Sequence, residues 1–187
     1  MTIGNWQDYR GKGEGVLIHL SSSEPLLEPH FETGTFGFLQ CIEARTRVAA
    51  LKARRRYFLF GTRYQGALQE FQGRFLIIGY MRLDKTLDVR TRHVHKWMEN
   101  RESASPECMD METCHAFQSH EMNFYAPADA FELTEELMQK WGYKGKITKQ
   151  MKLTFTEDKL GKILEHFKSK TPDNTLYQPG LTPVDQA

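Results

Sequence analysis

Two histidines and an aspartate supply the residue types that acid–base chemistry needs. His93 and His95 are separated by one residue, so on a strand they would share a face, and an unperturbed histidine titrates near neutrality. Asp84 is the candidate acid of this set, with His115 and Glu121 as further members. No serine or cysteine lies in an elbow-type nucleophile motif. These residues form a candidate catalytic set, and the sequence leaves open whether the protein is an enzyme.

A second group of residues has the chemistry of zinc ligands. It consists of Cys108, Cys114, His115 and His120. The group does not reproduce the paired C-x2–4-C and H-x3–5-H units of structural zinc sites, so we predict no metal. The glycine-rich residues 11–15 lack the ending of a phosphate-binding P-loop, and no cofactor is predicted. Three cysteines without a disulfide framework indicate reduced thiols in a cytoplasmic protein.

The charge of the chain is sorted along the sequence, although the net charge is only +1. Residues 45–98 hold thirteen Lys and Arg against three acids, a net charge of +10. Residues 99–140 hold two bases against ten acids, a net charge of −8. We call these two segments the basic block and the acidic block. A basic surface attracts anionic partners, so the basic block predicts nucleic acid as the partner.

Arginine and aromatic residues alternate within the basic block, which is the composition of a surface that binds phosphates and stacks on bases. The predicted contact residues are Arg54, Arg55, Arg56, Arg63, Tyr64, Tyr80, Arg82 and Trp97. The arginines would bind phosphates, while Tyr64, Tyr80 and Trp97 would stack. The alternative is that the basic block pairs with the acidic block inside the same fold, which would leave no binding surface.

The elements that must position these residues are strands followed by strands mixed with helices. Apolar runs at 57–60 and 75–81 predict a hairpin, and Gly79 indicates a bulge or a close backbone approach. Further strands are predicted at 16–20, 36–42, 117–125 and 147–155. Helices are predicted at 127–141 and at 156–167, the second with Thr156 as its N-cap. The order predicts an α+β fold with a mixed, mostly antiparallel sheet and peripheral helices.

The length of 187 residues predicts one domain, which we place at residues 1–170, followed by a polar C-terminal arm or tail at 171–187. Residues 1–6 have neither the basic nor the apolar region of a signal peptide. No apolar run approaches the roughly 20 residues of a membrane span, so no membrane association is predicted.

The central segments 57–63 (YFLFGTR) and 73–84 (GRFLIIGYMRLD) resemble the PUA-like superfamily, which includes EVE-type and ASCH-type domains. The resemblance implies a small mixed β-barrel with helices at its edge. It also implies recognition of RNA, or of modified bases in DNA, in a pocket beside the barrel. No pocket residue of the family is carried over to this chain.

Three functional hypotheses follow from the sequence. The first is a nucleic-acid-binding domain that recognises a flipped or modified base through a basic, aromatic-lined groove. The second is an enzyme that acts on a nucleotide or nucleic acid with His93, His95 or His115 and an acid. The third is an interaction protein that forms homo-oligomers when the acidic block of one copy meets the basic block of another.

Overall fold

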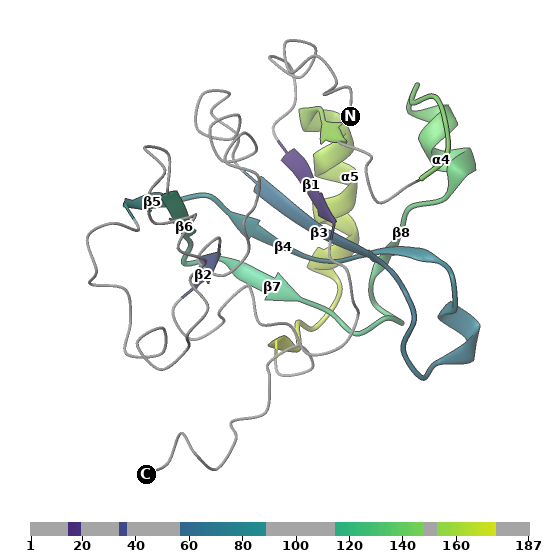
Figure 1. Cartoon of the computed structure of the whole chain (residues 1–187), viewed down its shortest axis with the longest axis horizontal. Helices are drawn as coiled ribbons and strands as arrows, with labels where there is room; N and C mark the ends of the chain where they lie inside the picture. The colour runs from purple at the N-terminus through teal and green to yellow at the C-terminus, as the bar shows by residue number, and fades with distance from the viewer. Residues whose placement is uncertain (1–14, 20–33, 37–56, 89–114, 148–152, 175–187) are drawn as a thin grey trace, which may run out of the picture.

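The computed structural model describes residues 15–19, 34–36, 57–88, 115–147 and 153–174. These residues form an α+β fold with a mixed sheet of six strands, a second sheet of three strands and two α-helices, as predicted (Figure 1). Within these ranges, no helix is both long and apolar enough to cross a membrane.

The large sheet has the strand order β7-β4-β3-β1-β9, and β8 also pairs with β4. Only β1 and β3 pair in parallel, and the other neighbours are antiparallel. The bounds are β1 Gly15–His19, β3 Tyr57–Arg63, β4 Phe75–Arg82, β7 Met122–Phe124, β8 Phe131–Glu132 and β9 Thr154–Phe155. Among the described residues, the sheet remains open, because β7 and β9 are its outer strands and do not pair with each other.

The predicted hairpin is confirmed by β3 and β4, which are joined through a short 3-10 helix, η2 (Gln69–Phe71). Both strands are continuously apolar up to their polar last residues, because the sheet is covered on both faces. Phe58 and Phe60 pack into one core cluster, while Leu59 packs into a second cluster on the opposite face. The second cluster lies under α5 (Glu157–Lys168), which contributes Leu160, Ile163 and Phe167 among its buried residues.

Both features predicted at Gly79, a bulge and a close backbone approach, are present. The register shifts between Phe60 and Gly61 of β3, opposite Gly79 and Ile77, so Ile78 is the extra residue of a bulge. A Cβ at position 79 would lie 2.6 Å from the Asn123 carbonyl oxygen of β7. Because the extra residue reverses which face each later side chain points to, Tyr80 packs against the cluster under α5.

The helix predicted at 127–141 is wrong over its first half. Residues 126–130 form a turn, and β8 pairs with the free edge of β4. Only α4 (Glu135–Lys140) is helical, and the Thr134 hydroxyl caps it by accepting a hydrogen bond from the Leu137 N–H at 3.1 Å. Pairing with β4 buries the backbone of β8 in a ladder, which outweighs the helical spacing of its apolar residues.

The helix predicted at 156–167 is confirmed as α5. Thr156 occupies the N-cap position, although its side chain makes no capping hydrogen bond. The strand predicted at 16–20 corresponds to β1, and the one predicted at 147–155 is described only in part, as β9.

The small sheet has the order β2-β6-β5, with bounds Thr35–Phe36, His115–Gln118 and Lys85–Asp88. The single strand predicted at 117–125 is instead two strands, β6 and β7, separated by Ser119 to Glu121. The strand predicted at 36–42 is described only at Phe36, whose ring meets the ring of Phe60 edge-on with centroids 5.0 Å apart. This contact joins the small sheet to the core of the large one.

The predicted C-terminal arm begins with residues that bind the outer edge of β7. The backbone N–H of Asp173 donates to the Phe124 carbonyl at 2.8 Å. The Asn174 side chain accepts a hydrogen bond from the Phe124 N–H at 2.8 Å and donates one to the Met122 carbonyl at 3.2 Å. Asn174 therefore replaces a neighbouring strand along this edge.

Candidate functional site

Much of the predicted site falls outside the described residues. This applies to Arg54, Arg55, Arg56, His93, His95, Trp97, Cys108 and Cys114. His115 lies on β6, where only the backbone is described. Within the described part of the chain, no three His, Cys, Asp or Glu side chains are grouped so that they could hold a metal ion.

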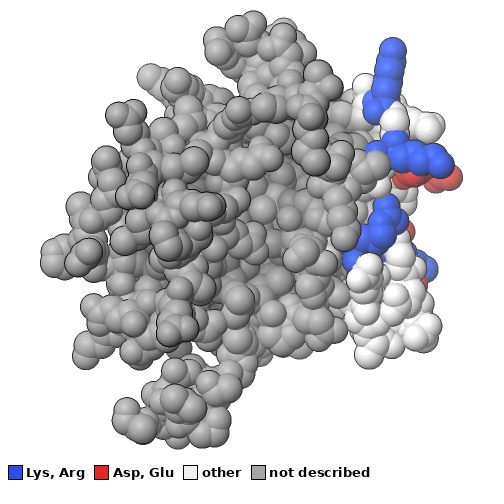
Figure 2. Space-filling view, viewed as in Figure 1, with Lys and Arg blue, Asp and Glu red and all other residues white. Residues whose placement is uncertain are grey.

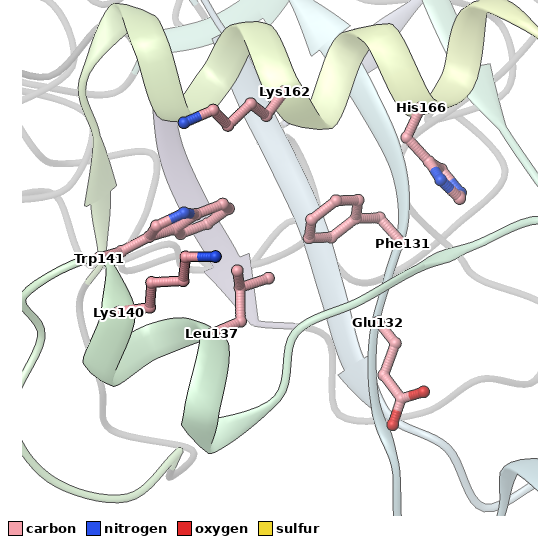
Figure 3. A pocket seen from close by; sticks show the side chains of 7 residues that line it. All are labelled: Phe131, Glu132, Leu137, Lys140, Trp141, Lys162 and His166. Carbon is pink, nitrogen blue, oxygen red and sulfur yellow. The ribbon is translucent and has the colours of Figure 1, made fainter.

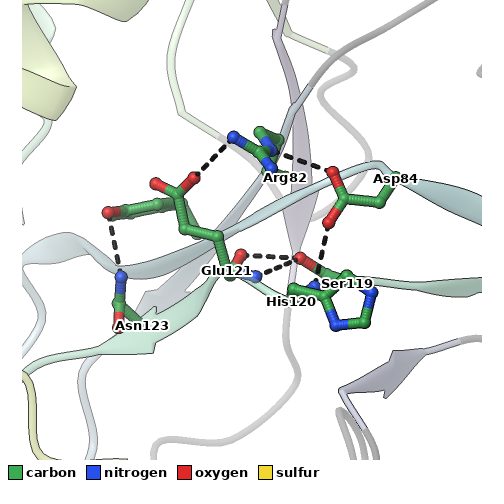
Figure 4. Close-up of polar contacts among 7 residues, drawn as sticks. Arg82, Asp84, Ser119, His120, Glu121 and Asn123 are labelled. Carbon is green, nitrogen blue, oxygen red and sulfur yellow. Dashed lines mark hydrogen bonds and ion pairs between the residues drawn. The ribbon is translucent and has the colours of Figure 1, made fainter.

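Arg82, a predicted phosphate ligand, lies at the end of β4 and is bound by two carboxylates (Figure 4). Its Nε donates to the Asp84 carboxylate at 2.9 Å, and its Nη1 lies 3.3 Å from a carboxylate oxygen of Glu121. The hydrogen bond to Asp84 raises the pKa of the guanidinium. With one cation between two anions, this group has a net charge of −1, which does not favour phosphate.

Asp84 has a structural role in the loop between β6 and β7. Its second carboxylate oxygen accepts a hydrogen bond from the His120 N–H at 2.9 Å. This backbone contact, followed by the contact with Arg82, lowers the pKa of Asp84 despite its partial burial. Ser119 holds the same loop, because its hydroxyl donates to the Glu121 carbonyl and accepts from the Glu121 N–H. Asp84 is therefore an ionised anchor for this loop rather than a free acid.

Tyr80 lies among aromatic side chains on the face of the sheet covered by α5. Its ring centroid is 6.1 Å from that of Tyr57, 6.4 Å from that of Tyr125 and 5.9 Å from that of Phe167. The Tyr80 hydroxyl accepts a hydrogen bond from the Asn123 amide at 3.0 Å. Burial raises the pKa of Tyr80 and that of Tyr125. Tyr80 is half-buried, and its ring is largely engaged in these contacts.

Tyr64 and Arg63 have different environments although they are adjacent. The Tyr64 ring is buried, packs edge-on against Phe71 and accepts a hydrogen bond at its hydroxyl from the Leu68 N–H. In this structure Tyr64 therefore offers no ring face for stacking, contrary to the role predicted for it. Arg63 is exposed, and its guanidinium donates to the carbonyls of Gly73 at 2.7 Å and Ile147 at 2.9 Å. Both acceptors are neutral, so they orient Arg63 without cancelling its charge.

Among the residues that the structure describes, the basic and acidic blocks meet at two ion pairs. Arg82 contacts Glu121, and Arg74 contacts Glu132 at 3.2 Å. In each pair the base comes from β4 or the residue before it, and the acid comes from the acidic block. This part of the charge sorting therefore joins neighbouring strands within one chain, which is the architectural alternative stated from the sequence.

The sequence also contains a second basic stretch, which the end of the acidic block at residue 140 divides in two. Residues 137–156 hold five lysines and no acid, and Trp141 and Tyr143 lie among them. The described lysines of this stretch are Lys140, Lys144 and Lys146, and all three are exposed. We call these three lysines and Arg63 the basic edge, because Arg63 is hydrogen-bonded to Ile147, which follows Lys146 in this stretch. Among the described residues, no carboxylate forms an ion pair with any of the four.

The basic edge lies beside α4 and the connection between β3 and β4. Figure 2 shows Lys and Arg side chains along this margin of the described surface, with Asp and Glu side chains beside them. Gly142 and Gly145 adopt φ angles of 83° and 99°, which favour glycine and turn the chain sharply around Lys144. The Tyr143 hydroxyl donates to the Thr154 carbonyl, which fastens this loop to β9.

Comparisons with known proteins place no relative beside this chain: no family model, no curated protein and no solved structure matches it.

Proposed function

We propose that this protein is a nucleic-acid-binding domain. The observation that carries the proposal is the basic edge: its three lysines lie close in the sequence, Arg63 is hydrogen-bonded to the same segment at Ile147, and none of the four cations forms an ion pair with a carboxylate of the described residues. Cations that are not neutralised by nearby acids create the positive potential that attracts a phosphate backbone.

Arg63 supports this proposal because it is oriented before any ligand binds. Two backbone carbonyls hold its guanidinium, and a side chain fixed in this way loses less conformational entropy when it binds a phosphate. Lys140, Lys144 and Lys146 are exposed, so their side chains can contact the phosphates of a single-stranded nucleic acid. Arg63 was predicted from the sequence as a phosphate ligand, and the three lysines are additional.

Three further arginines predicted from the sequence as phosphate ligands belong to the same proposal. Arg54, Arg55 and Arg56 directly precede Tyr57, which is the register partner of Arg82 in the β3–β4 pair. Further phosphate contacts by these arginines would extend the interface toward that end of the sheet. The PUA-like resemblance adds recognition of RNA or of a modified base in DNA beside a barrel. An experimental structure in which the outer strands β7 and β9 are joined would support that relationship.

The proposal is tested by the salt dependence of binding. Fluorescence anisotropy with a labelled single-stranded RNA or DNA would be measured over a salt series. Each phosphate contact to a single strand contributes about 0.7 to the slope of log K against log salt. Replacing both Lys144 and Lys146 by Gln should therefore reduce the slope by roughly 1.4.

The matched control is Lys168→Gln, because Lys168 is an exposed lysine on α5 whose neighbour is Glu165. This variant should bind with the wild-type slope. The proposal fails if the wild-type protein does not bind at low salt, if its affinity is independent of salt, or if the control weakens binding as much as the double variant.

A further inference from the structure

A hollow of about 480 Å³ lies between β8, α4 and α5, next to the basic edge (Figure 3). It is lined by Phe131, Glu132, Leu137, Lys140, Trp141, Lys162 and His166. Its volume is within the range of roughly 300–1,000 Å³ that is common for small-ligand sites. None of these residues belongs to the site predicted from the sequence.

Two aromatic rings form the apolar part of the hollow. The rings of Phe131 and Trp141 are nearly parallel, at 18°, with centroids 6.1 Å apart, and both residues are half-buried. The edge of the Phe155 ring supports Trp141 at 6.1 Å, and the His166 ring meets Phe131 edge-on at 5.4 Å. These contacts hold the two rings in place, and both rings line the hollow.

The position of Trp141 is fixed by α5 as well. Trp141 ends α4, and its carbonyl accepts a hydrogen bond from the Lys159 ammonium at 2.6 Å. The same ammonium lies 4.4 Å from the centroid of the Tyr143 ring. Lys159 therefore holds the end of α4, and with it Trp141, against α5.

The charged side chains around the rings favour an anion. In Figure 3, Lys162 reaches toward Trp141 from α5, and Lys140 lies on the other side of the indole. Lys162 forms an i,i+4 pair with Asp158, but both side chains are more than half exposed, so the pair is weak. Glu132 is the one carboxylate of the lining and is paired with Arg74, which does not line the hollow.

His166 adds a nitrogen whose state follows from its partner. Its Nε2 lies 2.9 Å from the Asp129 carbonyl oxygen, which can only accept a hydrogen bond. Nε2 therefore carries a hydrogen, and in the neutral ring Nδ1 is an acceptor. The lining thus combines two ring faces, two ammonium groups and an imidazole acceptor.

We propose that this hollow holds one unpaired nucleotide of the bound strand, with its base on the Trp141 and Phe131 rings and a phosphate between Lys140 and Lys162. The inference rests on the proposed function and names where a base is read. Every base presents a π-face for stacking, and its phosphate supplies the negative charge that the lysines match. A purely apolar ligand would leave Lys140 without an ion-pair partner among the described residues and Lys162 with only its weak, exposed pair to Asp158.

The test compares three variants in the single-strand binding assay. Trp141→Leu removes the stacking surface and should weaken binding roughly ten-fold, whereas Trp141→Phe keeps an aromatic face and should retain most of the affinity. Lys162→Gln changes no buried group, lies outside the basic edge and should reduce the salt slope by about 0.7. Circular dichroism and thermal unfolding verify that each variant is folded, and Lys162→Gln remains decisive if Trp141→Leu does not fold.

A second measurement separates this inference from the proposed function. Adenosine monophosphate is titrated into the full chain, and the Trp141 indole N–H resonance, assigned from Trp141→Phe, is followed by NMR. If the oligonucleotide binds but the variants match wild type and the resonance is unmoved, the hollow is not the base site and the proposed function stands. If no oligonucleotide binds, the proposed function fails, and a saturable shift of the resonance still supports nucleotide binding in the hollow. If no oligonucleotide binds and the resonance is also unmoved, both the proposed function and nucleotide binding in the hollow are overturned.

Discussion

Replacing Gly79 by alanine should destabilise the protein because β7, which pairs with β4, leaves no room for a Cβ atom at this residue. The added Cβ would lie 2.6 Å from the Asn123 carbonyl oxygen and 2.7 Å from Cγ of Phe124, whereas ordinary contacts begin at 3.4 Å. The carbonyl belongs to the backbone of β7, so the strand itself would have to move by about 0.8 Å. No rotation of a flexible side chain relieves the contact.

The cost follows from overpacking and from weakened strand pairing. Overpacking a well-packed site costs about 1–3 kcal/mol, and each hydrogen bond lost between β4 and β7 adds about 1 kcal/mol. Alanine also reduces the entropy of the unfolded chain, which returns about 0.4–1 kcal/mol. The free energy of unfolding should therefore fall by roughly 2–3 kcal/mol, a large fraction of the 5–15 kcal/mol that is typical of a domain.

Gly161→Ala is the matched control, because the chemical change is the same and the predicted sign is opposite. Gly161 lies within α5, and a Cβ there would meet nothing within 4 Å. Alanine should stabilise the helix by about 0.5–1 kcal/mol. Urea unfolding followed by circular dichroism measures both variants. The reasoning is refuted if Gly79→Ala is as stable as wild type, or if both variants shift the midpoint in the same direction.

Two further predictions concern the loop before β7 and the outer edge of that strand. The His120 N–H lowers the pKa of Asp84, so the native state binds this proton less tightly than the unfolded chain does. Its contribution is present above the unfolded pKa near 3.9 and is lost as pH falls through the lower native pKa, so Asp84→Asn should reduce the loss of stability on acidification. If the free energy of unfolding fell equally with decreasing pH in the wild-type protein and in Asp84→Asn, this reasoning would be contradicted. Asn174→Ala removes two hydrogen bonds from the edge of β7 and should cost about 1–2 kcal/mol. Hydrogen exchange at the Phe124 amide should accelerate, and an unchanged rate would show that Asn174 does not protect the edge of β7.

The parts of the fold that the sequence predicts well are those whose signals are local. The apolar runs in β3 and β4 are continuous because both faces of the sheet are covered, and Gly79 marks the bulge within the run. The stripe of Leu160, Ile163 and Phe167 identifies α5 by its helical spacing. Each of these patterns lies within one segment and can be recognised without knowledge of its partner.

The helix predicted at 127–141 fails because its outcome depends on a strand far away in the sequence. Phe131 has the spacing of a helical apolar face, yet it pairs with Ile77 of β4. A free strand edge nearby is a property of the tertiary fold and cannot be read from residues 127–141 alone. The local signal that does identify α4 is Thr134 followed by Glu135 and Glu136, a capping residue with two acids in the first turn.

The candidate site was only partly predictable for a similar reason. Counting charge over blocks identifies where bases are frequent but not which of them are paired. Arg74 and Arg82 lie in the most basic segment, and both are paired with acids of the next segment. The division at residue 140 also separated Lys140 from Lys144 and Lys146, which concealed a stretch without acids. A search for twenty-residue windows that contain several bases and no acid would have found this stretch.

The pairing of charges decides which described cations we expect to bind phosphate. Exposed ion pairs are worth about 0–1 kcal/mol each, so Arg82 could exchange Asp84 and Glu121 for a phosphate at little cost in pairing. The two carboxylates would nevertheless remain within a few ångströms of the incoming anion and repel it. The basic edge has four cations, none in an ion pair with a carboxylate of the described residues, so a phosphate meets an excess of positive charge there even with Glu135 and Glu136 exposed on the same helix as Lys140. An Arg82→Gln variant would therefore change protein stability more than nucleic-acid affinity, whereas loss of Lys144 and Lys146 would have the reverse effect.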